Sequence, residues 1–186
     1  FYVLIESTGG HQSSDDIQFE DAMEEAYEAG LLADAVVAQS KQQREDLWAI
    51  RDDIERLFQI HFPPIGFDVS LGIGEMDVFV EEIRTQLAER WPQHKMASFG
   101  HIGDGNIHLI IGVGSAAPED VHAVEEIVYG NLGRRGGVIS AEHGIGLEKR
   151  PHLHHSRSAN ELALMRTIKQ SMDPRNILNP GKIFES

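Results

Sequence analysis

A hairpin near the middle of the chain constrains the fold more than any other feature of the sequence. Residues 95–102 and 107–113 read as two strands that meet at Asp104-Gly105. Asp-Gly between two strand-like runs is a strong hairpin signal, because a type I′ turn needs a positive φ at both central positions. The sequence therefore predicts an antiparallel pair of strands at this point.

Strand-like and helix-like segments alternate on both sides of this hairpin. Further strands are predicted over 1–6, 31–39, 67–71 and 136–140, and helices over 15–29, 41–58, 75–91, 118–132 and 158–172. Apolar residues recur every three or four positions in the helical segments 41–58 and 75–91, which is typical of helices with one buried face. The order of segments predicts a single α+β domain over residues 1–186, a ferredoxin-like α+β sandwich with a mostly antiparallel sheet and helices packed on one face.

Composition and charge exclude several classes of protein. The 186 residues carry a formal net charge of −14, which repels nucleic acid and anionic membrane surfaces. Cysteine is absent, so disulfides, thiolate metal sites and cysteine nucleophiles are excluded. No apolar run approaches the ~20 residues that a membrane-spanning helix needs. The chain starts within a strand-like segment at Phe1, without a leader peptide, so we expect a fragment of a longer protein that is not secreted and is cytoplasmic or peripheral to the inner membrane.

Two histidines flank the hairpin turn. If Asp104-Gly105 forms a two-residue loop, His101 lies directly opposite His108 on one face of the hairpin. Opposed residues have Cβ atoms ~4.5–5.5 Å apart. Two imidazoles held in this way can share one metal ion, with Zn–N distances of ~2.0–2.1 Å. The alternative, which the spacing leaves open, is a half-exposed ribbon that binds no ligand.

A glycine-rich turn supplies a further ligand and a candidate base. Residues 140–146 place Glu142 and His143 after the strand-like segment 136–140. Glu142 would complete a set of two histidines and one carboxylate with positions left open for substrate, as in catalytic metal sites. His143 is then available as an acid–base group, because the unperturbed pKa of histidine lies near neutral pH.

A third group of histidines follows this turn. His152, His154 and His155 form a short cluster after Arg150-Pro151. Such a cluster could bind a metal adventitiously, but a solvated loop is the favoured interpretation.

Three motifs together resemble one family closely. They are residues 100–108 (GHIGDGNIH), 140–146 (SAEHGIG) and 173–182 (DPRNILNPGK). The family is the C-terminal, substrate-side domain of FAD-linked D-2-hydroxy-acid dehydrogenases and oxidases, of the D-lactate dehydrogenase, glycolate oxidase and D-2-hydroxyglutarate dehydrogenase type, in the vanillyl-alcohol-oxidase superfamily. The resemblance extends from about residue 31 to the end of the chain. It implies an α+β domain that caps the flavin, while an N-terminal FAD-binding domain of the same full-length chain holds most of the FAD.

The resemblance also implies roles for individual residues. His101, His108 and Glu142 match the family's metal ligands, which usually bind zinc, and His143 matches the catalytic base. Arg51 matches an arginine that binds the substrate carboxylate.

Other positions match residues of the family that lie near the flavin or contact the substrate. Asn179 matches a position near the flavin. Where the hydroxyglutarate branch has Thr, Lys and Asn in contact with substrate, this sequence has Glu55, Gly66 and Ile110. These departures favour a smaller or less charged 2-hydroxy acid, similar to lactate or glycolate.

The resemblance thus implies a flavoenzyme with FAD and a divalent metal, zinc by family precedent, that oxidises a D-2-hydroxy acid to the 2-oxo acid. The 186-residue fragment by itself is then expected to be inactive. The expected partners are a small 2-hydroxy acid and the FAD-binding domain; a homodimer is left open, and no nucleic acid is expected. The alternative function is a metal-dependent anion-binding or regulatory module without flavin chemistry.

Overall fold

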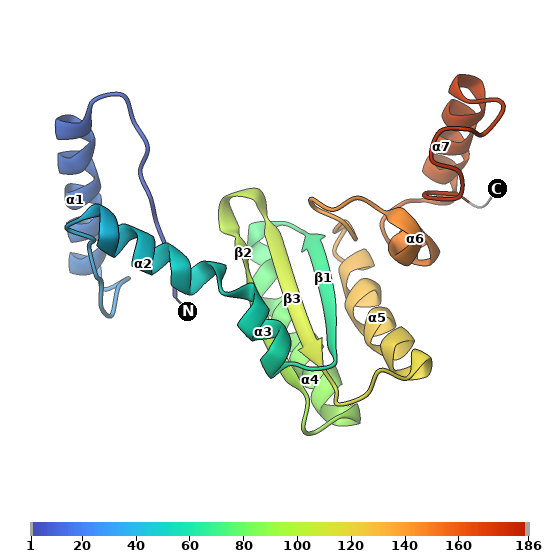
Figure 1. Cartoon of the computed structure of the whole chain (residues 1–186), viewed down its shortest axis with the longest axis horizontal. Helices are drawn as coiled ribbons and strands as arrows, with labels where there is room; N and C mark the ends of the chain where they lie inside the picture. The colour runs from blue at the N-terminus through green and yellow to red at the C-terminus, as the bar shows by residue number, and fades with distance from the viewer. Residues whose placement is uncertain (1, 185–186) are drawn as a thin grey trace. The chain divides into compact units, whose positions relative to one another are not determined.

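The computed structural model describes residues 2–184. The chain divides into two compact units, Phe1–Ile54 and Glu55–Ser186. Figure 1 shows the elements of both units in chain order. Each unit is described by itself.

The first unit contains two helices, α1 (Gln12–Glu28) and α2 (Lys41–Asp52). Ser40 begins α2, because its side chain accepts a hydrogen bond from the backbone N–H of Gln43. The indole Nε1 of Trp48 donates to Glu6 Oε2 at 2.9 Å, which ties the segment before α1 to α2. Of the residues in 2–54 whose burial the structure describes, none is buried.

Three sequence-based predictions fail in or next to this unit. Residues 2–6 and 31–39 form no strand, and Phe1 lies outside the described residues. A run of apolar residues alone does not make a strand, since a strand also needs a neighbour for its backbone hydrogen bonds. The predicted helix 41–58 is interrupted at Asp53, whose ψ of 56° is not helical, so that α3 (Ile54–Ile60) follows α2 as a separate helix.

The second unit is built on an antiparallel sheet. Its strands are β1 (Pro64–Ser70), β2 (Lys95–His101) and β3 (Asn106–Gly112), in the order β1-β3-β2. Val138 forms an isolated antiparallel bridge with Ser70, so the segment around it lies along the free edge of β1. The spatial order Val138, β1, β3, β2 is that of a ferredoxin-like sheet whose last strand is reduced to a bridge. The predicted α+β class is confirmed.

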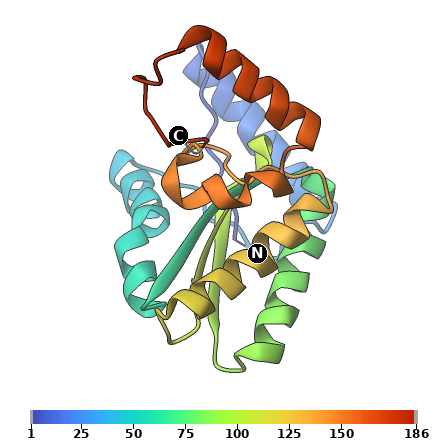
Figure 2. The ribbon, with the colours of Figure 1, turned by 90° about the vertical axis from the view of Figure 1, so that its right-hand side faces the viewer.

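Two helices cover one face of this sheet, α4 (Met76–Arg90) and α5 (Pro118–Gly133), as Figure 2 shows. The core between sheet and helices includes Phe67, Val69, Ile107, Leu109 and Ile111 from the strands, Phe79, Ile83 and Leu87 from α4, and Val124, Val128 and Leu132 from α5. Successive side chains of a strand point to opposite faces. Asp68 and His108, which alternate with these core residues, therefore lie on the face away from α4 and α5.

Short helices and one long helix complete the unit. They are η1 (Ile73–Glu75), η2 (Ile102–Asp104), α6 (Gly146–Lys149), η3 (Arg150–His155) and α7 (Ala159–Met172). A capping box formed by Ser158 and Glu161 begins α7, close to the predicted start. The sequence predicted neither α6 nor η3. Within residues 2–184, no helix is both long and apolar enough to cross a membrane.

Candidate functional site

The hairpin that carries the two predicted metal ligands has a longer turn than the sequence predicts. The short helix η2 and Gly105, at φ +65°, form the turn in place of a two-residue loop. His101 is therefore paired with Asn106, and His108 with Phe99, so the direct opposition of His101 and His108 is wrong. The register differs by two residues from the predicted one, and an even shift keeps both histidines on the same face.

The three predicted metal ligands lie together. The ligand atoms of His101, His108 and Glu142 are all within 4.8 Å of one another. His101 Nδ1 is 2.9 Å from Glu142 Oε1, and His108 Nε2 is 3.9 Å from Glu142 Oε2. Because the side chains of His101 and Glu142 are partly exposed, the group is open to solvent on one side.

Asp68 holds the turn that carries Glu142 and His143. Its Oδ2 accepts hydrogen bonds from the backbone N–H groups of both residues, at 2.8 and 2.9 Å. The bridge between Ser70 and Val138 brings this turn alongside β1, and the backbone N–H of Ala141 donates to Asp68 O at 3.3 Å. Two residues more than 70 positions away from β1 are thereby fixed next to the sheet.

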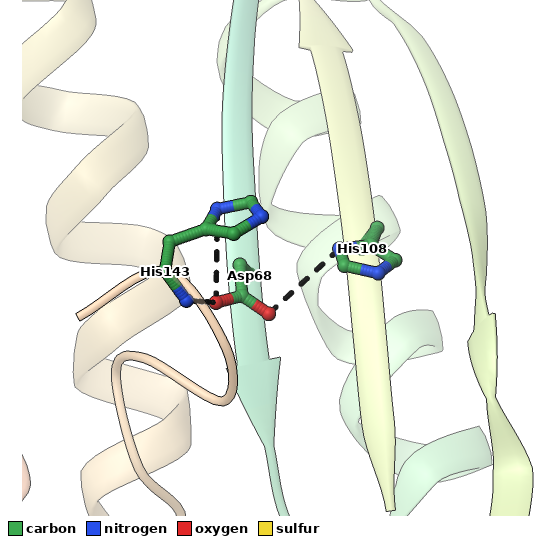
Figure 3. Close-up of side chains that lie close together, drawn as sticks. All are labelled: Asp68, His108 and His143. Atoms are coloured by element: carbon green, nitrogen blue, oxygen red, sulfur yellow. Dashed lines mark hydrogen bonds and ion pairs between the residues drawn. The ribbon is translucent and has the colours of Figure 1, made fainter. Parts of the chain in front are cut away.

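The ring of His143 lies on the other side of the same carboxylate from His108, as Figure 3 shows. His143 Nδ1 is 3.7 Å from Asp68 Oδ2, and His108 Nδ1 is 3.8 Å from Asp68 Oδ1. The His143 side chain is 64% exposed. With Nδ1 directed to Asp68, its Nε2 is the nitrogen available to a substrate.

Two buried charges stabilise each other beneath the site. Burial by itself disfavours the ionised form of Asp68, but the backbone N–H groups of His143 and Glu142 and the charge of Lys149 outweigh it, so the pKa of Asp68 lies below its usual value. Lys149 Nζ is 3.6 Å from Asp68 Oδ2 and donates to Ser140 Oγ at 3.0 Å. Burial lowers the pKa of Lys149, against the opposing effect of Asp68.

His108 is held in the form that binds metals. Burial is the main reason that its pKa lies below the usual value, and the neighbouring rings of His101 and His143 act in the same direction. The carboxylates of Asp68 and Glu142 oppose this effect. Near neutral pH the ring is uncharged and has a lone pair for a ligand.

Asn106 lies between the predicted ligands and is buried. Its Nδ2 donates to Glu142 Oε1 at 2.7 Å and lies 3.5 Å from a nitrogen of both His101 and His108. Its Oδ1 is buried without a hydrogen-bond partner in the described part of the chain. The amide therefore fixes the direction of the Glu142 carboxylate.

Sequence reasoning did not single out Asp68, Asn106 or Lys149. A signal existed for Asp68, which is a lone acid between Phe67 and Val69 in an apolar strand. A charge at such a position lies on the other face of the sheet from the apolar residues and needs a partner when buried. Lys149 gave no comparable signal, because an isolated lysine in a polar segment is ordinary.

Two further residues were predicted to belong to the site, Arg51 and Asn179. Arg51 belongs to the first unit, at the end of α2, where its Nη1 is 3.0 Å from Asp52 Oδ1. Asn179 lies in the turn after α7, at φ +46°. Their roles in binding the substrate carboxylate and the flavin remain predictions.

The donor set suits a divalent metal. Two imidazole nitrogens and one carboxylate oxygen converge, and this combination binds zinc and similar ions while it leaves coordination positions open. His108 offers Nε2 towards Glu142 while its Nδ1 faces Asp68, the arrangement in which a carboxylate orients a metal-binding imidazole. The fold and the site define an α+β domain with a candidate metal centre next to a candidate base.

Comparison with known proteins assigns the family. Residues 1–183 match the family described as FAD linked oxidases, C-terminal domain. The chain belongs to this family, as its three motifs predict.

The curated relatives include enzymes of two names. The chain is 36% identical, over 99% of its length, to a D-2-hydroxyglutarate dehydrogenase of Stutzerimonas stutzeri, of which it covers 40%. It is 35% identical, over 99% of its length, to the mitochondrial D-2-hydroxyglutarate dehydrogenase of Arabidopsis thaliana, of which it covers 32%. It is also 35% identical, over 98% of its length, to a putative mitochondrial D-lactate dehydrogenase of Schizosaccharomyces pombe, of which it covers 36%. The chain thus spans two fifths or less of each of these relatives.

Proposed function

We propose that this chain is the substrate-side domain of a flavoenzyme that oxidises a D-2-hydroxy acid to the 2-oxo acid. The observation that carries the proposal is the convergence of His101, His108 and Glu142 within 4.8 Å, beside His143, in a member of the FAD-linked oxidase family. Relatives named for D-2-hydroxyglutarate and D-lactate agree with this class of substrate.

His101, His108 and Glu142 would hold a divalent metal, for which zinc is the proposed ion. Such an ion, when bound, acts as a Lewis acid that lowers the pKa of a substrate hydroxyl. Asn106 supports the set, because its Nδ2 directs the Glu142 carboxylate. The partly exposed side of the group is where a substrate would enter.

His143 would accept the hydroxyl proton at Nε2. Asp68 Oδ2 accepts from the His143 backbone and lies near Nδ1, so it orients the ring and stabilises the imidazolium that forms. Oxidation removes this proton and a hydride from Cα, and FAD supplies the hydride acceptor. Asn179 is the proposed contact of this chain with the flavin.

The substrate is proposed to be small and to carry one carboxylate. Arg51 would pair with that carboxylate through two parallel N–H···O bonds. Gly66 and Ile110 are paired across β1 and β3, on the sheet face that carries Asp68 and His108. Neither residue offers a charge to a second carboxylate, which favours a lactate-like acid over D-2-hydroxyglutarate.

The test uses the full-length gene product. We expect it to bind FAD and zinc, and anaerobic D-lactate to bleach the flavin absorbance more rapidly than D-2-hydroxyglutarate does. Glu142→Gln, which keeps the volume but removes the charge, should lose zinc and slow flavin reduction by at least about a hundredfold. The matched control is Glu119→Gln, at an exposed position in the first turn of α5, which should behave as the wild type.

The outcomes separate the alternatives. Absence of FAD from the full-length product would contradict the proposed function. Binding of zinc with no flavin reduction by any 2-hydroxy acid would favour a metal-dependent anion-binding module. Faster reduction by D-2-hydroxyglutarate than by D-lactate would contradict the proposed substrate while leaving the reaction class intact.

A further inference from the structure

A second group of histidines and glutamates lies where α5 packs against η3. His152 and His155 come from η3, and Glu125 and Glu126 from α5. In a 3₁₀-helix the side chains at i and i+3 are eclipsed, so both histidines project from the same side of η3. Their rings are stacked, with centroids 6.1 Å apart and an angle of 18° between the planes.

Three ligand atoms of this group converge. Glu126 Oε1 is 3.4 Å from His152 Nδ1 and 3.7 Å from His155 Nε2. Both ring nitrogens are buried and have no hydrogen-bond partner among the described residues. The His152 side chain is only 4% exposed, so the predicted solvated loop is wrong for this residue.

The tautomer of His152 follows from its other nitrogen. His152 Nε2 lies 3.2 Å from Glu125 Oε2, and a carboxylate can only accept, so Nε2 carries the proton. The other ring nitrogen, Nδ1, faces Glu126. The ring of Tyr129, with its centroid 4.8 Å away, packs against His152 and limits its rotation.

His155 Nε2 faces the same point, 3.7 Å from Glu126 Oε1. One cation between the two imidazole nitrogens and the carboxylate oxygen would give a partner to both buried nitrogens.

We propose that Glu126, His152 and His155 form a second metal site, which takes a divalent ion of the zinc type. Tetrahedral zinc with bonds of ~2.0–2.1 Å sets its ligand atoms ~3.3 Å apart, close to the observed spacing from Glu126 to His152. Glu125 supplies the carboxylate that usually orients a metal-binding imidazole. The half-exposed Glu126 side chain provides a path for the ion to enter.

The role of this ion is structural. It would join η3, which follows the turn that carries Glu142 and His143, to α5, which packs on the sheet. Ligands from two elements far apart in sequence make metal binding a contribution to the folding free energy. None of the three ligands belongs to the set formed by His101, His108 and Glu142.

The experiment isolates this site from the first one. In the full-length gene product, His101→Ala and Glu142→Ala are combined so that the first set loses two ligands. After removal of metals by a chelator, Zn²⁺ is titrated in competition with a chelating indicator, and thermal unfolding is followed with and without Zn²⁺. We expect one equivalent of Zn²⁺ to bind and to raise Tm.

Single substitutions in that background identify the ligands. Glu126→Gln and His155→Phe should each weaken Zn²⁺ binding by about a hundredfold or more and remove the Tm increase. The matched control His154→Phe, at an exposed neighbour with its own contact to Pro151 O, should bind Zn²⁺ like the background.

Two results would overturn the proposal. One is the absence of a Zn²⁺ equivalent in the background protein; the other is unchanged Zn²⁺ affinity in Glu126→Gln. Glu126 is half exposed and its replacement keeps the side-chain volume, so we expect Glu126→Gln to fold. This variant therefore tests the second metal site even if His155→Phe fails to fold.

Discussion

The carboxylate of Asp68 accepts hydrogen bonds from the backbone of both residues that carry the proposed chemistry, Glu142 and His143. Asp68→Asn keeps the shape but removes the charge, and it leaves Lys149 buried without its counter-charge. We expect a loss of about 1–3 kcal/mol in the free energy of unfolding, measured by urea denaturation. Asp77→Asn is the same change at an exposed position of α4, and it should lower the free energy of unfolding by less than about 0.5 kcal/mol.

The same carboxylate predicts a pH dependence. The pKa of Asp68 is lower in the folded state than its usual value of 3.8, so the unfolded chain binds the proton more readily. The stabilisation is therefore complete above the unfolded-state pKa and is lost as the pH falls through the folded-state pKa. The difference in unfolding free energy between wild type and Asp68→Asn should shrink below about pH 4. A difference that stays constant from neutral to strongly acidic pH would contradict this assignment.

At the scale of elements, the hairpin of β2 and β3 depends on a close backbone approach at Gly100. A Cβ atom added there would lie 2.2 Å from Asn106 O, and backbone cannot yield as a flexible side chain does. Gly100→Ala should destabilise the second unit by about 1–3 kcal/mol, measured by thermal or urea unfolding. The control is Gly103→Ala in the turn of the same hairpin, where an added Cβ meets no atom within 4 Å. Equal stability of the two variants would contradict this prediction, because it would mean that β2 can move away from Asn106 without a loss in the free energy of unfolding.

At the scale of the whole molecule, the two units differ in what they bury. Most core residues of the second unit come from β1, β3, α4 and α5, whereas no residue of 2–54 whose burial the structure describes is buried. Backbone amides in regions with few buried contacts exchange through local opening. In the 186-residue chain, amides of α1 and α2 should exchange with deuterium at least about a hundredfold faster than those of α4 and α5. Similar protection of all four helices, measured by mass spectrometry, would contradict this expectation.

Local patterns in the sequence sufficed for most elements of the second unit. The strands of the hairpin, α4, α5 and α7 were predicted close to their observed bounds, because periodicity and turn residues act over a few neighbouring positions. The motif histidines and Glu142 were predicted as one set, and their ligand atoms lie within 4.8 Å of one another. The failed strands at 2–6 and 31–39 show the limit of this approach, since their pattern lacks a partner.

Other features of the site depend on residues that are distant in sequence. Asp68 is 74 positions from Glu142, yet it fixes that residue's backbone. The turn register of the hairpin and the burial of His152 against Tyr129 likewise follow from packing rather than from local preference. The side chains that have the chemistry to bind a metal or move a proton can be identified from residue types and motifs alone. Their mutual geometry was set by the sheet and by the bridge at Val138, because hydrogen bonds and burial between distant segments carry no signature in a short stretch of sequence.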